Sequence, residues 1–217
     1  WMTASQKRRA AQLVSLLENG TIEIRYDYVE NLNDGRGYTL GRAGFTTANG
    51  DAYLVMQRYT YLKPQNALAK FMPILKTLAQ NESGDVSGLS GFPVAWATVA
   101  KDSVFQQAQD QVTDELYYVP AMQKADEIGI KSALGRAILF DTIIQHGGGT
   151  GPDSLQAIVD RTATIMQGTP LNGVDEPRWL NAFIRVRSQD LLSPSDAATK
   201  AVWAESESRL DVWQQLI

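Results

Sequence analysis

The sequence has 217 residues and a mass of 23.9 kDa, enough to form one domain with a substantial buried core. Twenty basic and 24 acidic residues give a formal net charge of −4, which argues against a surface that binds nucleic acid. Zero cysteines and one histidine exclude thiol nucleophiles, disulfides, iron–sulfur clusters and cysteine/histidine zinc sites. Any catalysis must therefore use carboxylates, hydroxyl groups or the single imidazole.

Two absences from the sequence bear on where the protein works. It contains no run of 18 apolar residues, and its first residues show neither a charged nor an apolar signal-peptide region. We therefore expect a soluble chain without a targeting segment as given. The mature form of an exported protein has the same appearance.

The N-terminal third predicts one helix followed by a small antiparallel sheet. Thr3 and Gln6 have the spacing of a capping box, and Asn19–Gly20 is a stop signal, so a helix is expected between them. Strict alternation of apolar and polar residues over 22–28 predicts a strand. A turn is expected over 33–37, followed by one or two further strands within 38–47.

The remainder of the chain predicts helices. Apolar periodicity and stop signals place them at 51–62, 65–80, 93–116, 120–128, 131–146, 153–167, 175–192 and 197–216. The stretch 131–145 is apolar on most sides, which is typical of a helix buried in the centre of a domain. The predicted fold class is α+β, mostly α. We expect a single two-lobed domain over 1–217, with the sheet in a smaller lobe at about 20–80.

Two carboxyl groups of the N-terminal region have contrasting surroundings. Glu18 lies at the C-terminal end of the first helix beside leucines, where the helix dipole and apolar neighbours both oppose ionisation. Asp34 lies in a glycine-flanked turn beside Arg36, where ionisation is favoured. Such a pair suits the general acid and general base of glycoside hydrolysis. Each carboxylate taken alone is more commonly a solvated surface group.

His146 ends the long apolar helix and precedes a run of glycines. A His-Gly-Gly-Gly oxyanion loop of an esterase is excluded, because the chain has no second histidine and no Gly-x-Ser-x-Gly motif. A helix C-cap, in which the histidine interacts with terminal carbonyl groups, is one interpretation. A histidine that faces a ligand at a flexible loop is the other.

A group of charged residues in the C-terminal half is compatible with an internal ion-pair network. Asp141 lies on the apolar helix, and Arg185 and Arg187 lie on a later one. Carboxylates that face a core are rarely left unpaired, so we expect a structural ion pair.

Several motifs resemble those of the family 46 glycoside hydrolases, the chitosanases. In the N-terminal part they are Glu18-Asn19-Gly20, Tyr28-Val29-Glu30, Asp34-Gly35-Arg36-Gly37-Tyr38-Thr39, Gly44-Phe45-Thr46-Thr47 and Gly50-Asp51. Later ones are Val104 to Gln109, Tyr117-Tyr118-x-Pro120-Ala121, Phe140-Asp141-Thr142 with His146-Gly147, and Trp179-Leu180-Asn181-x-Phe183. The resemblance spans nearly the whole chain, and the secreted Bacillus-type enzymes are the most similar.

This resemblance implies a lysozyme-like, two-lobed fold with a small antiparallel sheet beside the cleft and a buried central helix. It implies endo-acting, inverting hydrolysis of β-1,4-linked glucosamine in chitosan, with no metal or organic cofactor. Glu18 matches the general acid, Asp34 the general base and Thr39 the hydroxyl that holds the attacking water. The positions that match sugar contacts are Tyr28, Glu30, Arg36, Gly44, Asp51 and His146. Asp141 and Arg187 match an ion-pair network that supports the acid, with Lys200 as the nearest equivalent of a second arginine.

Two alternative functions remain open at this point. One is a lysozyme-like peptidoglycan hydrolase, against which the acidic net charge argues because bacterial walls are anionic. The other is a non-catalytic sugar-binding helical protein, against which the pair Glu18 and Asp34 argues. With chitosanase as the first choice, we expect glucosamine oligosaccharides as partners, no nucleic acid or membrane partner, a monomer, and an extracellular location.

Overall fold

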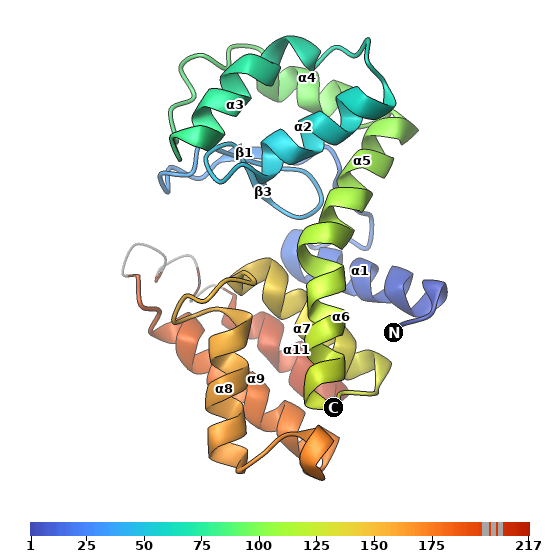
Figure 1. Ribbon diagram of the computed structural model, residues 1–217, viewed down its shortest axis with the longest axis vertical. Coiled ribbons are helices and arrows are strands. Elements are labelled where there is room, and N and C mark those ends of the chain that lie inside the picture. The colour runs from blue at the N-terminus through green and yellow to red at the C-terminus, as the bar shows by residue number, and fades with distance from the viewer. Residues whose placement is uncertain (197–199, 201–202, 204–205) are drawn as a thin grey trace. The chain divides into compact units, whose positions relative to one another are not determined.

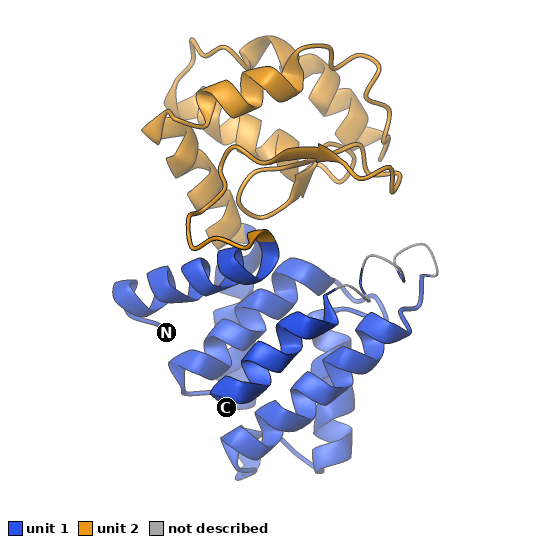
Figure 2. Ribbon diagram, turned by 180° about the vertical axis from the view of Figure 1, so that it is seen from behind, with its two compact units in different colours: residues 1–18, 116–217 blue, residues 19–115 orange. Residues whose placement is uncertain are grey.

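The computed structural model describes residues 1–196, 200, 203 and 206–217. Its main chain divides into two compact units, drawn in different colours in Figure 2. Unit 1 comprises residues 1–18 and 116–217, and unit 2 comprises residues 19–115. No helix in the described part of the chain is long and apolar enough to cross a membrane.

Unit 1 is helical (Figure 1). Its elements are α1 (Ala4–Asn19, whose last residue is counted in unit 2), the end of the π-helical segment η2 (Asp114–Tyr118), α6 (Val119–Ile128), α7 (Ala133–His146), α8 (Leu155–Met166), the 3₁₀ turn η3 (Pro170–Asn172), α9 (Glu176–Leu192) and α11 (Glu207–Leu216). The expected capping box of α1 is present, since the Thr3 amide donates to Gln6 Oε1 at 2.8 Å and the Gln6 amide donates to Thr3 Oγ1 at 3.2 Å.

The centre of unit 1 is α7. All nine residues from Gly135 to Ile143 are buried, which confirms the expected central helix. This helix packs against α6 and α8, and its apolar side chains join those of α9 and α11 in one core. A helix that is apolar on most sides can bury its whole circumference only in such a position.

Unit 2 contains the sheet. Its three strands are β1 (Val29–Asn31), β2 (Tyr38–Leu40) and β3 (Phe45–Thr46), antiparallel and in the order β1-β2-β3. The register pairs Glu30 with Thr39, and Thr39 with Thr46. The helices of this unit are α2 (Asp51–Leu62), the 3₁₀ turn η1 (Ala69–Phe71), α3 (Met72–Gln80), α4 (Phe92–Val99) and α5 (Ser103–Thr113).

The prediction of a strand over 22–28 is wrong. This segment forms turns, in which the Tyr26 amide donates to the Ile24 carbonyl at 3.1 Å and the Tyr28 amide donates to the Arg25 carbonyl at 3.4 Å. The Tyr26 carbonyl is bound by side chains of Trp96 and Gln109 instead of a neighbouring strand. Ile22, the first apolar residue of the alternating pattern, is 57% exposed. The alternation therefore marks a loop held by tertiary contacts.

Three expected helices differ from the structure. The helix expected over 93–116 is divided into α4 and α5, because Asp102 caps α5 by accepting a hydrogen bond from the Val104 amide at 2.9 Å. The helix expected over 65–80 starts later, at Met72, after the turn η1. Of the helix expected over 197–216, the structure shows α11, and most of 197–205 lies outside the described residues.

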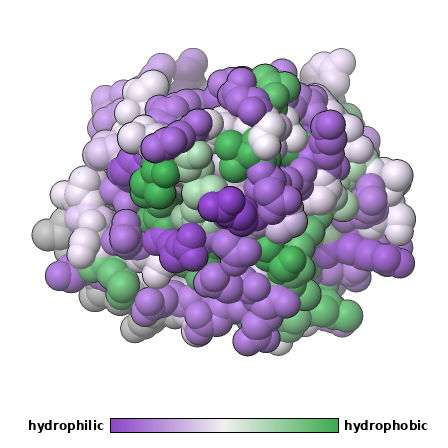
Figure 3. Space-filling view, turned by 90° about the horizontal axis from the view of Figure 1, so that it is seen from below, coloured by the Kyte–Doolittle hydropathy of each residue, from purple (hydrophilic) through white to green (hydrophobic). Residues whose placement is uncertain are grey.

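The sheet-bearing unit is larger than the expected lobe of about 20–80, because it continues to Glu115. Its additional helices pack on earlier parts of the unit: α5 lies against α2, and α4 lies against β1. Figure 3 shows one face of the protein, on which hydrophilic residues predominate and hydrophobic residues form small separate groups.

Candidate active site

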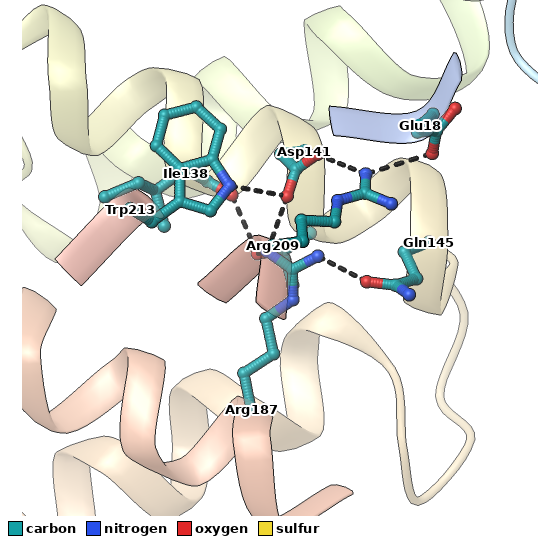
Figure 4. Close-up of polar contacts among 8 residues, drawn as sticks. Glu18, Ile138, Asp141, Gln145, Arg187, Arg209 and Trp213 are labelled. Carbon is teal, nitrogen blue, oxygen red and sulfur yellow. Dashed lines mark hydrogen bonds and ion pairs between the residues drawn. The ribbon is translucent and has the colours of Figure 1, made fainter. Parts of the chain in front are cut away.

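Glu18 is the last residue of unit 1 before the boundary and lies in the final turn of α1. Its Oε1 atom is 3.0 Å from Nη2 of Arg209, which comes from α11 (Figure 4). About a quarter of the side chain, 24%, is exposed. The carboxyl group is thus paired with a buried arginine while one part of it remains accessible.

Asp141 is the centre of the polar cluster around Glu18. It is fully buried on α7 and accepts hydrogen bonds from Arg187 Nη1 at 2.7 Å, from Trp213 Nε1 at 3.0 Å, and from Arg209 Nη2. Arg187 also donates to Gln145 Oε1 at 2.5 Å. The expected ion pair between Asp141 and Arg187 is therefore present, and Arg209 links it to Glu18 (Figure 4).

Within this cluster the pKa of Glu18 is raised and the pKa of Asp141 is lowered. Desolvation raises the pKa of Glu18, an effect that Arg209 opposes and Asp141 reinforces. Desolvation also acts to raise the pKa of Asp141, but Arg209 and Arg187 outweigh it and lower the pKa to about 2. Asp141 is therefore a permanent anion at neutral pH, whereas Glu18 holds its proton more strongly than an exposed glutamate.

The structure corrects the sequence-based assignment of the network at two basic residues, Lys200 and Arg185. Lys200, the nearest equivalent expected for a second arginine, is exposed, and Arg209 occupies that role in the structure. Arg185 of α9 is exposed as well. Of the two arginines of α9 that the sequence suggested for the network, the structure places Arg187 in it. The available signal was the spacing of Arg209 and Trp213, which lie four residues apart and therefore on one face of a helix.

Asp34 lies in the turn between β1 and β2 and is bound by its local neighbour Arg36. Its Oδ2 atom accepts from Arg36 Nε at 2.9 Å and Nη2 at 2.6 Å, and its Oδ1 accepts from the Arg36 amide at 3.0 Å. Partial burial alone raises the pKa of Asp34, but the hydrogen bonds from Arg36 outweigh it and lower the pKa. The contrast that the sequence predicts between Glu18 and Asp34 is thus present in the direction of the two pKa shifts.

Thr39 lies in β2, opposite Glu30 of β1. Its side chain is buried, and its Oγ1 atom has no hydrogen-bond partner among the residues that the structure describes. A buried hydroxyl without a protein partner is well suited to bind a water molecule. Glu30 accepts a hydrogen bond from the Tyr28 hydroxyl at 2.5 Å, so these two expected sugar contacts form a pair.

Gly44 and Asp51 lie around β3. Gly44 has φ of 65° and closes the turn between β2 and β3, where its amide donates to the Gly41 carbonyl at 3.3 Å. Asp51 begins α2, and its Oδ1 atom accepts from the Thr46 amide at 2.7 Å and the Ala52 amide at 3.0 Å. These backbone contacts fix the position of the Asp51 carboxyl group.

His146 ends α7, and Gly147 follows it as the C-cap with φ of 79°. Its Nδ1 atom lies 2.9 Å from the Asp153 carbonyl oxygen, so the histidine contacts the loop before α8 and not the terminal carbonyls of α7. Its ring lies 4.7 Å from the ring of Trp203, centre to centre. Burial and the nearby Arg187 lower the pKa of His146 to about 3, which keeps the imidazole neutral.

The structure thus assembles the predicted residues into two groups. In unit 1, Arg209 and Asp141 connect Glu18 to Arg187, and His146 lies at the end of the same central helix. In unit 2, Asp34 pairs with Arg36, and Tyr28 pairs with Glu30 opposite Thr39. Within the described ranges, no group of three or more histidine or carboxylate side chains could hold a metal ion.

Comparison with known proteins decides the family. The model of glycosyl hydrolase family 46 matches residues 12–216. The chain belongs to this family. It is 52% identical over 215 residues to a chitosanase of Bacillus subtilis (strain 168), with 99% of this chain and 78% of the relative covered. A chitosanase of Streptomyces sp. (strain N174) is 42% identical over 191 residues, covering 87% of this chain and 67% of that relative.

Solved structures agree with this assignment. The native chitosanase from Bacillus subtilis MY002 matches with a TM-score of 0.96 and 51% identity, covering 100% of this chain and 90% of that one. A family 46 chitosanase of Gynuella sunshinyii in complex with chitotetraose matches with a TM-score of 0.95 and 46% identity, covering 100% of this chain and 89% of that one. The resemblance stated from the motifs and the expected lysozyme-like fold are therefore confirmed.

Proposed function

We propose that this glycoside hydrolase is a chitosanase that cleaves internal β-1,4 bonds between glucosamine units, with Glu18 as general acid and Asp34 as general base. The observation that carries the assignment of roles is the opposite displacement of the two pKa values, upward for Glu18 and downward for Asp34. An acid must still hold its proton near neutral pH, and a base must already have lost it. The related chitosanases solved with chitotetraose and with six glucosamine units support the substrate class.

In the proposed reaction, the Glu18 carboxylic acid protonates the glycosidic oxygen as the bond to the anomeric carbon breaks. Asp34 removes a proton from a water molecule that attacks the opposite face of the sugar ring, so the configuration inverts. The Thr39 hydroxyl helps to hold that water. It is buried, and its oxygen has no hydrogen-bond partner among the residues that the structure describes. Both protons are accounted for, and no metal or organic cofactor takes part.

The Asp141 ion-pair network is proposed to support the acid. Arg209 donates to both Glu18 and Asp141, and Arg187 holds Asp141 from the other side. Because Asp141 stays ionised, Arg209 is shared between two carboxylates and stabilises the Glu18 anion less than an undivided ion pair would. After proton transfer, the same arginine provides a partner for the Glu18 carboxylate.

The remaining residues are proposed to bind the sugar chain. Carboxylates suit a partly protonated amino sugar, so we assign Asp51 and Glu30 to ammonium groups. The Arg36 guanidinium offers N–H donors for sugar hydroxyl groups, and the Tyr28 oxygen, whose own proton goes to Glu30, can accept a hydrogen bond from one. The absence of a side chain at Gly44 lets a sugar approach the backbone. A further contact is assigned to His146, whose imidazole is neutral and can bind a sugar hydroxyl without repelling an ammonium group.

A paired activity assay tests the proposed function. We expect the release of reducing ends from chitosan and no release from bacterial peptidoglycan, the alternative substrate. Glu18→Gln and Asp34→Asn should each lower turnover by about 10²–10⁴ or more, while oligosaccharide binding is largely retained. Wild-type-like turnover in either variant would contradict its assigned role. Binding of oligosaccharides without any turnover by the unaltered protein would favour the non-catalytic alternative.

Early-time proton NMR of oligosaccharide cleavage tests the stereochemistry. Inversion at a β-linked sugar gives the α-anomer as the first product. A first-formed β-anomer would overturn the inverting mechanism and the water-holding role of Thr39.

The proposed substrate is a polymer, so we propose that the enzyme acts outside the cell. Chitosanase activity in the cell-free medium of the source organism would test this location.

A further inference from the structure

Gln109 of α5 is a buried polar residue to which the reaction assigns no role. Its side chain is fully buried, and both ends of its amide are bound to backbone groups of unit 2. Oε1 accepts from the Arg42 amide at 3.0 Å, and Nε2 donates to the Tyr26 carbonyl at 3.0 Å. One side chain therefore ties together two backbone points that flank the first two strands of the sheet.

These two points lie beside the residues proposed to act on the substrate. Tyr26 precedes β1, which carries Glu30, and Arg42 follows β2, which carries Thr39. The Gly41 amide donates to the Tyr28 carbonyl at 2.8 Å and closes the ladder between the two strands at the same end. Gly41 and Arg42 follow Thr39 by two and three residues, so the backbone that Gln109 binds directly continues the strand that carries Thr39.

The backbone at Gly41 packs tightly against the side chains of Gln109 and Trp96. A Cβ atom at Gly41 would lie 2.3 Å from Gln109 Oε1 and 3.0 Å from Trp96 Cζ2, so only glycine fits against the amide. Trp96 Nε1 donates at 3.0 Å to the same Tyr26 carbonyl that Gln109 binds. Asp110, the next residue of α5, accepts from the Tyr26 hydroxyl at 2.9 Å and pairs with the Arg42 guanidinium.

We propose that Gln109 is a positioning residue for catalysis, because it fixes the end of β2 and thereby the place of the Thr39 hydroxyl. The inference rests on the proposed function, in which Thr39 holds the attacking water. A reacting group displaced by about 1 Å can cost on the order of 10²-fold in rate, so a buried amide that sets this distance acts on catalysis without touching substrate. Gln109 differs in this from Asp110, which also binds residues 26 and 42 but does so through their side chains.

The chain offers a matched control on the same helix. Gln106 lies one turn earlier on α5, and its Nε2 donates at 2.9 Å to the Ala100 carbonyl, which belongs to the end of α4. Gln106→Met removes a side-chain-to-backbone bond of the same type from the same helix, but at a backbone point that carries no proposed site residue. Gln109→Met retains most of the side-chain volume while removing both amide contacts.

The experiment compares kcat, KM and Tm for Gln109→Met, Gln106→Met, Thr39→Val and the double variant of Gln109 and Thr39. We expect Gln109→Met to lower kcat by about 10-fold or more with a smaller change in KM, and Gln106→Met to leave kcat within about 2-fold. If Gln109 acts through Thr39, the double variant loses less than the product of the two single losses. Gln109→Glu, which keeps the acceptor for Arg42, replaces the methionine variant if that variant does not fold.

Two outcomes would overturn the inference. Multiplicative losses in the double variant, or a kcat within about 2-fold of the unaltered protein for the folded Gln109 variants, would show that the amide stabilises the unit without positioning Thr39. An unchanged kcat in Thr39→Val would remove the basis of the inference by contradicting the proposed role of Thr39. The unaltered protein's activity on chitosan, measured in the same series, separates either result from a failure of the chitosanase assignment.

Discussion

The surroundings of Glu18 and Asp34 differ in how they are built. The arginine that binds Glu18 is 191 residues away in the sequence, and it is shared with the Asp141 carboxylate, which Arg187 of α9 and Trp213 of α11 also bind. The arginine that binds Asp34 is two residues away in the same turn. The pKa of Glu18 is therefore set by the packing of unit 1, whereas the pKa of Asp34 is set by a local turn.

The two environments also differ in their exposure to solvent. Asp141 and the Arg187 side chain are fully buried, and the Arg209 side chain is 7% exposed. The side chain of Arg36 is 47% exposed, so water screens its pair with Asp34. Loss of one charge should therefore have a large effect around Glu18 and a small effect around Asp34. Three experiments test this difference.

The largest effect is expected for Asp141→Asn, because it removes the carboxylate that pairs with the fully buried Arg187 and leaves Arg209 with Glu18 alone. Removing one partner of a buried ion pair typically costs about 3–5 kcal/mol in the free energy of unfolding. Denaturant unfolding measures this loss. In the control Asp126→Asn, the arginine partner Arg136 is 9% exposed but the aspartate is 50% exposed, so a loss of about 1 kcal/mol or less is expected. Equal losses in the two variants would contradict the structural argument.

An intermediate effect is expected from His146, the single histidine of the chain. Its pKa is lowered from the usual 6.5 to about 3 in the folded protein, so the unfolded chain binds the proton more readily. Protonation therefore favours the unfolded chain, so the free energy of unfolding decreases progressively as the pH falls from 6.5 towards 3, and this loss is absent well above pH 6.5. Between about pH 7 and pH 4 the loss should be on the order of 1–3 kcal/mol, and His146→Gln should remove this component.

Proton NMR checks the cause of this pH dependence directly. Because the chain has one histidine, the resonances of its imidazole ring can be identified and followed without resolving them from those of other histidines. A titration midpoint near 6.5 in the folded protein would show that the imidazole is not desolvated as the structure indicates. A pH-dependent stability that is identical in His146→Gln would assign the effect to other groups.

The smallest effect is expected for Arg36→Gln. This change removes the guanidinium that lowers the pKa of Asp34, so the pKa rises towards its usual value. Because the proposed base must be ionised, the acidic limb of kcat/KM against pH should move to higher pH, by less than about one unit. Arg25→Gln is the matched control, since Arg25 pairs with Asp27 in the same unit at 2.8 Å but contacts no proposed catalytic group. A shift of equal size in both variants would assign the effect to net charge.

The sequence by itself determined the features that depend on neighbouring residues. The capping box fixes the start of α1, the turn chemistry of 33–37 separates β1 from β2, and the all-round apolar stretch marks α7. The direction of the Asp34 pKa shift was predictable for the same reason, because Arg36 is adjacent. The family motifs indicated the substrate class, since they lie within short contiguous segments.

Only the tertiary structure decided the features that depend on distant partners. The segment 22–28 has the alternation of a strand, but side chains of α4 and α5 bind its Tyr26 carbonyl and hold it as a loop. Arg209, and not Lys200, completes the network of Asp141, because helix packing brings that face of α11 to α7. Spacing along a chain records which residues share a helix face, and it contains no information about which distant face they meet. For this reason the partner of Glu18 and the two backbone contacts of Gln109 emerged only from the folded protein.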